Sequence, residues 1–188
     1  IVATLLLFLS VTLHELGHSL QAIKYGVKVR DITLMPMGGL AQMESIPEDP
    51  NKELRIAIAG PLVNFGIAAL LIGLGALLDA RALVSLEELQ ASLGSVSWSG
   101  LLAYLTSANL MLGFFNLIPA FPMDGGRVLR ALLAKKMNHA KATKIAAQVG
   151  QGLALLMGLW GFMSGSWTLV IIAIFVWMGA GQESQGAQ

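Results

Sequence analysis

The sequence contains no cysteine and few charged residues. Of its 188 residues, 12% are charged and 55% are hydrophobic, and the mean hydropathy is +0.70. Soluble domains carry about 25% charged residues, so this composition excludes an ordinary soluble domain and an intrinsically disordered chain. A net charge of +1 excludes a nucleic-acid-binding domain. Without cysteine there is no disulfide framework, and any metal site must use histidine, carboxylate or water.

Three long stretches contain no Asp, Glu, Lys or Arg, namely residues 56–78, 98–123 and 145–182. A helix needs about 20 apolar residues to cross a bilayer, so we predict an all-α polytopic membrane protein. The last stretch is too long for one span, and it divides at residues 164–166 because Ser-Gly-Ser favours a turn. We therefore expect a single transmembrane core over residues 1–188 with about five spans. These spans cover residues 1–22, 55–78, 98–118, 145–163 and 167–181.

The basic residues are distributed unequally between the two sides of these spans. If the segment after the first span faces inside, eleven of the twelve Lys and Arg residues lie on that side, and Arg81 lies opposite. Cytoplasmic loops of membrane proteins carry such an excess of Lys and Arg. We therefore expect a multi-pass protein of the cell membrane whose C-terminus is cytoplasmic.

Residues 28–45, in the inside segment after the first span, predict a short β-hairpin at the membrane surface. A β-branched and apolar run over residues 29–35 is followed by Pro-Met-Gly-Gly and by a second short apolar run, a pattern typical of a hairpin. Such a hairpin can offer an edge strand to an extended peptide. A simple surface loop explains the same residues equally well, and the two interpretations stay open at this stage.

The first expected span contains His14-Glu15-Leu16-Gly17-His18 near its inside end. Residues four apart stack on one face of a helix, so both imidazoles point to one place and Glu15 lies at the edge of that face. This is the H-E-x-x-H pattern, in which two histidines bind Zn²⁺ and the carboxylate takes a proton from water. Because ionisable groups within a span are costly, a site is favoured over histidines that merely bond to neighbouring helices.

A catalytic zinc ion usually has three protein ligands, and the third must come from elsewhere in the chain. His139 lies among four lysines, which favours a solvated histidine, and surface solvation accounts for Glu53 and the other carboxylates near the hairpin. Asp124 follows the inside end of the third span, in a loop over residues 119–127. Two prolines interrupt the helix there, and irregular backbone at membrane depth lines a cavity. The sequence does not separate ligation by Asp124 from capping of the following helix.

HELGH within a span, followed by N-x-x-P-x-x-P-x-D-G-G-R over residues 116–127, resembles the site-2 protease family of intramembrane zinc metalloproteases. The segment GPLVN over residues 60–64 is similar to another signature of that family. The MPMGG and GAGQES segments resemble its archaeal and bacterial branch, in which CBS domains often follow the membrane core. The family core usually has six spans, so we expect the helix before HELGH, and any C-terminal CBS domains, to be absent from this chain.

The resemblance implies one zinc ion per chain, with His14, His18 and Asp124 as ligands and Glu15 as the catalytic base. It also implies that Asn116 orients substrate or stabilises the oxyanion, although a structural hydrogen bond explains this residue equally well. The implied activity is hydrolysis of peptide bonds within or near a transmembrane segment, from a site that opens to the cytoplasm. The implied partners are the lipid bilayer and a membrane-protein substrate, such as a single-span anti-sigma factor in regulated intramembrane proteolysis.

Two functions of other classes fit the sequence less well. A metal-ion transporter needs further carboxylates along a path through the bilayer, and Glu15 is the only one expected within a span. A scaffold without activity has no need of the carboxylate at Glu15. A protease is therefore the favoured interpretation.

Overall fold

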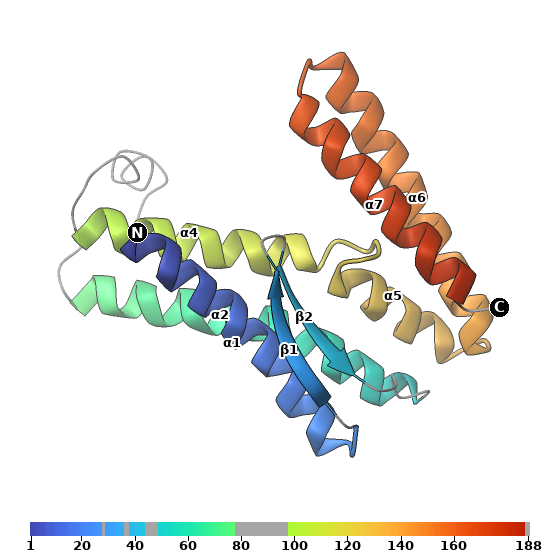
Figure 1. Ribbon diagram of the computed structural model, residues 1–188, viewed down its shortest axis with the longest axis horizontal. Helices are drawn as coiled ribbons and strands as arrows, with labels where there is room; N and C mark the ends of the chain where they lie inside the picture. Colours follow the sequence, from blue (N-terminus) through green and yellow to red (C-terminus); the bar gives the residue numbers. More distant parts are fainter. Residues whose placement is uncertain (28, 36–37, 44–48, 78–97, 187–188) are drawn as a thin grey trace. The chain divides into compact units, whose positions relative to one another are not determined.

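The computed structural model describes residues 1–27, 29–35, 38–43, 49–77 and 98–186, and these residues form six helices and two strands (Figure 1). In chain order the elements are α1 (Val2–Lys24), β1 (Val29–Met35), β2 (Gly38–Met43), α2 (Pro50–Leu77), α4 (Trp98–Asn116), α5 (Asp124–Ala134), α6 (His139–Met163) and α7 (Trp167–Gly186). The chain divides into two compact units, Ile1–Glu44 with Ala59–Phe114, and Ser45–Ile58 with Phe115–Gln188. Helix α2 contributes to both.

In the first unit, strands β1 and β2 pair antiparallel, with Met35 opposite Gly38 and Leu34 opposite Gly39 (Figure 1). The register shifts between Val29 and Asp31, where the pairing is irregular. Both strands lie within the predicted hairpin region. The connecting residues 36–37 lie outside the described residues, and a hairpin at the membrane surface stays a prediction.

Small residues allow the helices of the first unit to pack closely. A Cβ atom at Gly17 of α1 would lie 2.8 Å from Val63 Cγ2 and 3.0 Å from the carbonyl oxygen of Ala59 on α2. Between α4 and α1, Asn109 donates a hydrogen bond to Ser10 Oγ at 3.1 Å. Lipid gives helices no hydrophobic reason to associate, so close packing at small residues and hydrogen bonds between helices hold such a bundle together.

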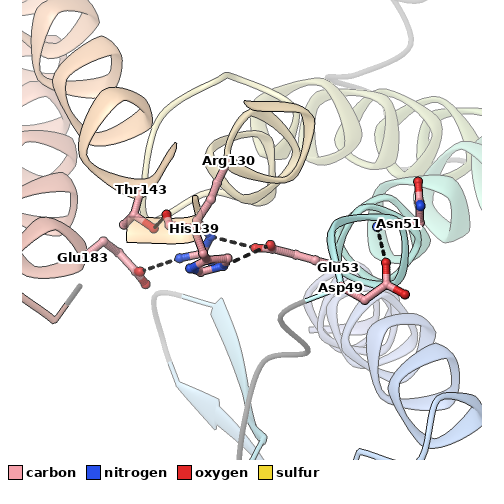
Figure 2. Close-up of polar contacts among 7 residues, drawn as sticks. All are labelled: Asp49, Asn51, Glu53, Arg130, His139, Thr143 and Glu183. Atoms are coloured by element: carbon pink, nitrogen blue, oxygen red, sulfur yellow. Dashed lines mark hydrogen bonds and ion pairs between the residues drawn. The ribbon is translucent and has the colours of Figure 1, made fainter. Parts of the chain in front are cut away.

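The second unit contains the N-terminal turns of α2 together with α5, α6 and α7. Helix α2 begins with Pro50 at its first position, where proline loses no helical hydrogen bond. The N–H of Asn51 donates to Asp49 Oδ1 at 2.9 Å, which caps this end (Figure 2).

The predicted break between the last two spans is confirmed. Helix α6 ends at Met163 and α7 begins at Trp167. Gly165 between them has φ +70°, a conformation that glycine adopts without steric cost. The N–H of Ser166 donates to the carbonyl oxygen of Gly161 at 2.8 Å, and this bond reverses the chain so that α7 packs along α6.

Among the described helices, α1, α2, α6 and α7 are long and apolar enough to cross a membrane, judged by length and composition. Their surfaces carry large exposed apolar side chains, such as Leu70, Phe162 and Trp177, as expected of side chains that face lipid. Helix α4, the third expected span, does not meet the same criterion. It has no charged residue, and it contains Ser, Thr and Asn residues. The number of spans therefore stays approximate, and the expected external loop at residues 78–97 lies outside the described residues.

Candidate metal centre

The two histidines of the HELGH motif face each other on helix α1. His14 and His18 are both buried, and their Nε2 atoms lie 3.2 Å apart. Zinc binds imidazole nitrogen at about 2.05 Å, so two nitrogens on one tetrahedral ion lie about 3.3 Å apart. The spacing of the pair fits two ligands of one zinc ion, and it is also the length of a hydrogen bond between the two rings.

Gly60 on α2 leaves the Nε2 side of both rings open. A Cβ atom at this position would collide with His18 Nε2 and would lie 2.7 Å from His14 Nε2. Any side chain would therefore fill the space in front of the two nitrogens. The histidine spacing and this open space together fit a zinc ion, and they give a physical reason for glycine at the start of the GPLVN segment.

This close approach makes a testable prediction. Gly60→Ala should displace the imidazoles and lower the zinc affinity of the purified chain by roughly tenfold or more, the size of effect seen when ligand orientation is disturbed. Zinc affinity can be measured by competition with a chelator. Gly66→Ala is the matched control on the same helix, because a Cβ atom at Gly66 meets no atom within 4 Å. Equal zinc affinities in the two variants would contradict this account of Gly60.

Glu15 lies beside His14 on α1 and is half-buried. The hydroxyl of Ser19 donates to the backbone carbonyl of Glu15 at 2.9 Å. Glu15 is thus adjacent in sequence to His14 on a regular helix, and its role as a proton acceptor stays a prediction.

Asp124 belongs to the second unit and is the first residue of α5. Its N-cap is Met123, which forms no side-chain cap bond, so the alternative that Asp124 is the N-cap of this helix is wrong. The predicted loop over residues 119–127 also ends earlier than expected, at Met123, because the Gly-Gly-Arg segment is already helical. Asp124 is only 8% exposed, and a buried carboxylate is hydrogen-bonded, paired with a cation or bound to a metal.

The loop that leads to Asp124 is part of the core of the second unit. Ala120 and Met123 pack with residues of α6 and α7, and Phe121 packs with a second group of buried alanines on the same helices. The peptide bond between Phe121 and Pro122 is cis. The irregular backbone of this loop is thus covered by α6 and α7.

Two glycines after Asp124 let α5 approach its own preceding loop. A Cβ atom at Gly125 would collide with the carbonyl oxygens of Leu117 and Ile118, and one at Gly126 would lie 2.7 Å from the amide nitrogen of Phe121. Larger residues would push the helix away from the loop. The Asp-Gly-Gly sequence therefore fixes the position of the carboxylate relative to the loop.

The structure corrects the expectation for Glu53. This carboxylate was expected to be solvated, but it is 0% exposed and accepts a hydrogen bond from Arg130 Nε at 2.7 Å (Figure 2). Helix α2 begins at Pro50, so Glu53 lies on the same helix face as Ile56 and Gly60, both of which are buried. That apolar periodicity is the signal in the sequence that could have predicted its burial.

His139 and Asn116 lie at helix ends. His139 is the first residue of α6, is 36% exposed, and places Nε2 3.4 Å from Glu53 Oε2. It is therefore less solvated than expected, and its neighbour is a carboxylate. Asn116 is half-buried at the C-terminal end of α4, and its role in substrate binding stays a prediction.

Comparison with known proteins gives consistent matches. The family model described as peptidase family M50 matches residues 2–93 and 81–157. A zinc metalloprotease of Methanocaldococcus jannaschii is 50% identical over 96% of this chain and 49% of the relative. Stage IV sporulation protein FB of Bacillus subtilis is 31% identical over 84% of this chain and 49% of that protein.

A solved structure is also similar. The site-2 protease from Methanocaldococcus jannaschii matches with a TM-score of 0.71 and 50% identity, over 96% of this chain and 76% of that one. The chain spans about half the length of the curated relatives that it matches.

Proposed function

Because the chain belongs to peptidase family M50, the family of the site-2 proteases, we propose that it is a zinc metalloprotease that cleaves peptide bonds within or near transmembrane segments of other proteins. The observation that carries this proposal is the pair of buried histidines whose Nε2 atoms lie 3.2 Å apart on a candidate membrane span. Such a pair within a bilayer is costly unless it has a function.

We propose His14, His18 and Asp124 as the ligands of one zinc ion per chain. The HExxH pattern, the burial of all three residues and the position of Asp124 in the second family motif support this set. Three protein ligands leave one position open, as in catalytic zinc sites.

The bound ion supplies a Lewis acid that polarises the scissile carbonyl and makes water acidic enough to attack at neutral pH. Glu15 accepts the proton of the attacking water and returns it to the leaving amine. Asn116 hydrogen-bonds the substrate near the scissile bond. His14, His18 and Asp124 are each buried, and electrostatic contacts are stronger among buried groups than in bulk water.

The substrate class follows from the position of the histidine pair on a candidate span. A transmembrane helix hides its carbonyl groups in backbone hydrogen bonds, so it must unwind before cleavage, and in lipid its freed polar groups need new partners. The paired strands β1 and β2 offer an edge for such an extended segment. A single-span regulator such as an anti-sigma factor fits this requirement, and CBS domains after α7 would belong to the longer protein.

The test of this function uses the purified chain in lipid vesicles with a single-span reporter peptide. We expect cleavage within or next to the reporter's span, loss of cleavage on treatment with a zinc chelator, and recovery when zinc is added back. Cleavage that persists after complete removal of zinc, or a metal-loaded chain that cuts no membrane segment, would contradict the proposal.

We also propose that the C-terminus and the opening of the active site face the cytoplasm, on the basis of the excess of basic residues on one side. Single cysteines introduced at Asn51, His139 and Gln185 should react with an impermeant thiol reagent from the cytoplasmic side. A cysteine at Glu88 should react from the opposite side. The chain has no native cysteine that would add background. Labelling of position 139 from outside would contradict the orientation.

A further inference from the structure

Arg130 is a buried cation on α5, the helix that begins with Asp124. Its side chain is 3% exposed, and its Nε donates to Glu53 Oε1 at 2.7 Å while NH1 donates to Glu183 Oε2 at 3.0 Å (Figure 2). Glu53 belongs to the first turn of α2 and Glu183 to the last turns of α7. We call Arg130, Glu53 and Glu183 the Arg130 network. It ties the helix of the proposed third ligand to two other helices of the same unit.

Burying the charged groups of the Arg130 network costs free energy, so folding stability alone does not account for it. Removing a guanidinium and a carboxylate from water is expensive, and a buried ion pair is seldom more stable than apolar residues of the same size. An arginine differs from lysine here, because its planar fork fixes the direction of two hydrogen bonds at once. The two hydrogen bonds of Arg130 therefore constrain the orientation of α5 relative to α2 and α7.

The network also reaches the loop before Asp124. The Arg130 guanidinium lies 5.2 Å from the centroid of the Phe121 ring, within the range of a cation–π interaction. Phe121 is almost completely buried, and its backbone packs directly against Gly126. Arg130 thus contacts the loop on one side of Asp124 and holds the helix on the other side.

Helix α7 contacts both the loop before Asp124 and the Arg130 network. A Cβ atom at Gly179 would lie 2.6 Å from Pro122 Cδ, so α7 packs against the residue two positions before Asp124. Glu183 follows Gly179 by one helical turn and lies on the same face of α7. The same stretch of α7 therefore contacts the loop through Gly179 and the Arg130 network through Glu183.

We propose that Arg130 is a positioning residue for Asp124, which acts by fixing α5 and the preceding loop through the Arg130 network. This inference rests on the proposed function, in which Asp124 is a zinc ligand. Arg130 itself touches neither metal nor substrate in this account. Its effect is on how well the carboxylate of Asp124 is presented to the ion.

The experiment compares zinc affinity and the visible spectrum of the cobalt-substituted chain in Arg130→Gln and in the unsubstituted chain. We expect Arg130→Gln to lower zinc affinity by roughly tenfold or more, as for other residues that orient a metal ligand. The cobalt absorption bands should shift, because they report the geometry of the ligands. At saturating zinc, kcat for the reporter should fall while KM stays unchanged.

Matched variants separate positioning from a general loss of structure. Lys135→Gln removes an exposed charge just after the end of α5 and should change neither affinity nor spectrum. Arg130→Lys should restore only part of the affinity, because lysine lacks the fork. Glu53→Gln keeps the size of the partner and removes its charge, so it should reproduce the effect of Arg130→Gln even if that variant folds poorly.

The outcomes distinguish this inference from the proposed ligand set. Unchanged zinc affinity and an unchanged cobalt spectrum in Arg130→Gln or Glu53→Gln, together with loss of zinc in Asp124→Ala, would overturn the positioning role and leave Asp124 as a ligand. Full zinc affinity in Asp124→Ala would remove Asp124 from the ligand set, and the positioning role would fall with it.

Discussion

Glu15→Gln should abolish nearly all cleavage of the membrane reporter and leave bound zinc at one ion per chain. The amide has almost the size of the carboxylate but cannot accept a proton at neutral pH. General-base catalysis contributes about 10² to 10⁴ in rate, so kcat should fall by roughly 10²-fold or more. The measurement pairs reporter cleavage with metal analysis of the same preparation.

Measuring cleavage and bound zinc in the same preparation distinguishes a catalytic base from a metal ligand at Glu15. Retained cleavage would show that Glu15 is not the base, and loss of zinc would show that Glu15 is a ligand. Thr12→Val on the same helix is a suitable control, because the Thr12 hydroxyl bonds to the carbonyl oxygen of Phe8 and has no part in the mechanism. That variant should keep both zinc and activity.

Local patterns in the sequence predicted the helices and the turn whose formation depends on residues close together in the chain. The apolar stretches predicted α1, α2, α6 and α7, and Ser-Gly-Ser predicted the turn at Gly165, because hydropathy and backbone freedom act within a few residues. The spacing of His14 and His18 likewise predicted two imidazoles on one face, since the helical repeat alone brings them together.

Contacts between distant segments were not predicted, although the apolar periodicity of α2 could have indicated that Glu53 is buried. Glu53 is separated from Arg130 by 77 positions, and neither segment contains a pattern that identifies the other as its partner. A charged residue near a helix end looks solvated until its partner is known, so the sequence suggested an exposed carboxylate where the structure has a buried ion pair. The start of α5 was misplaced for a related reason, because its two glycines, weak helix formers, are required by close contacts with the loop before Asp124.

The ligands of the proposed metal site also differ in whether local or distant residues position them. His14 and His18 are placed by one helix, and Gly60 gives them room through a single close contact. Asp124 is placed by a loop whose residues Ala120, Phe121 and Met123 pack among α6 and α7. A disturbance of packing far along the chain should therefore affect the carboxylate before it affects the histidines.

His14→Ala, His18→Ala and Asp124→Ala should each remove most of the bound zinc. Structural zinc sites with four protein ligands have apparent binding free energies of about 10–16 kcal/mol, so we expect the loss of one ligand here to cost about 3 kcal/mol, or roughly 10²-fold in affinity. Equilibrium dialysis against a zinc buffer measures this directly. His139→Ala tests the alternative third ligand and should lose far less zinc than these three variants, because its imidazole faces Glu53 of the Arg130 network.

The stoichiometry decides whether these residues share one ion. With one shared site, each of the three variants loses the single ion of the chain, and no variant keeps a tightly bound remainder. If the histidines and Asp124 bound separate ions, the unsubstituted chain would hold two, and each variant would lose only one of them. Loss of zinc in His139→Ala with full occupancy in Asp124→Ala would instead make His139 the third ligand. A catalytic zinc site keeps one position open beside its protein ligands, so the ligand count also determines whether Glu15 would have a water molecule to deprotonate.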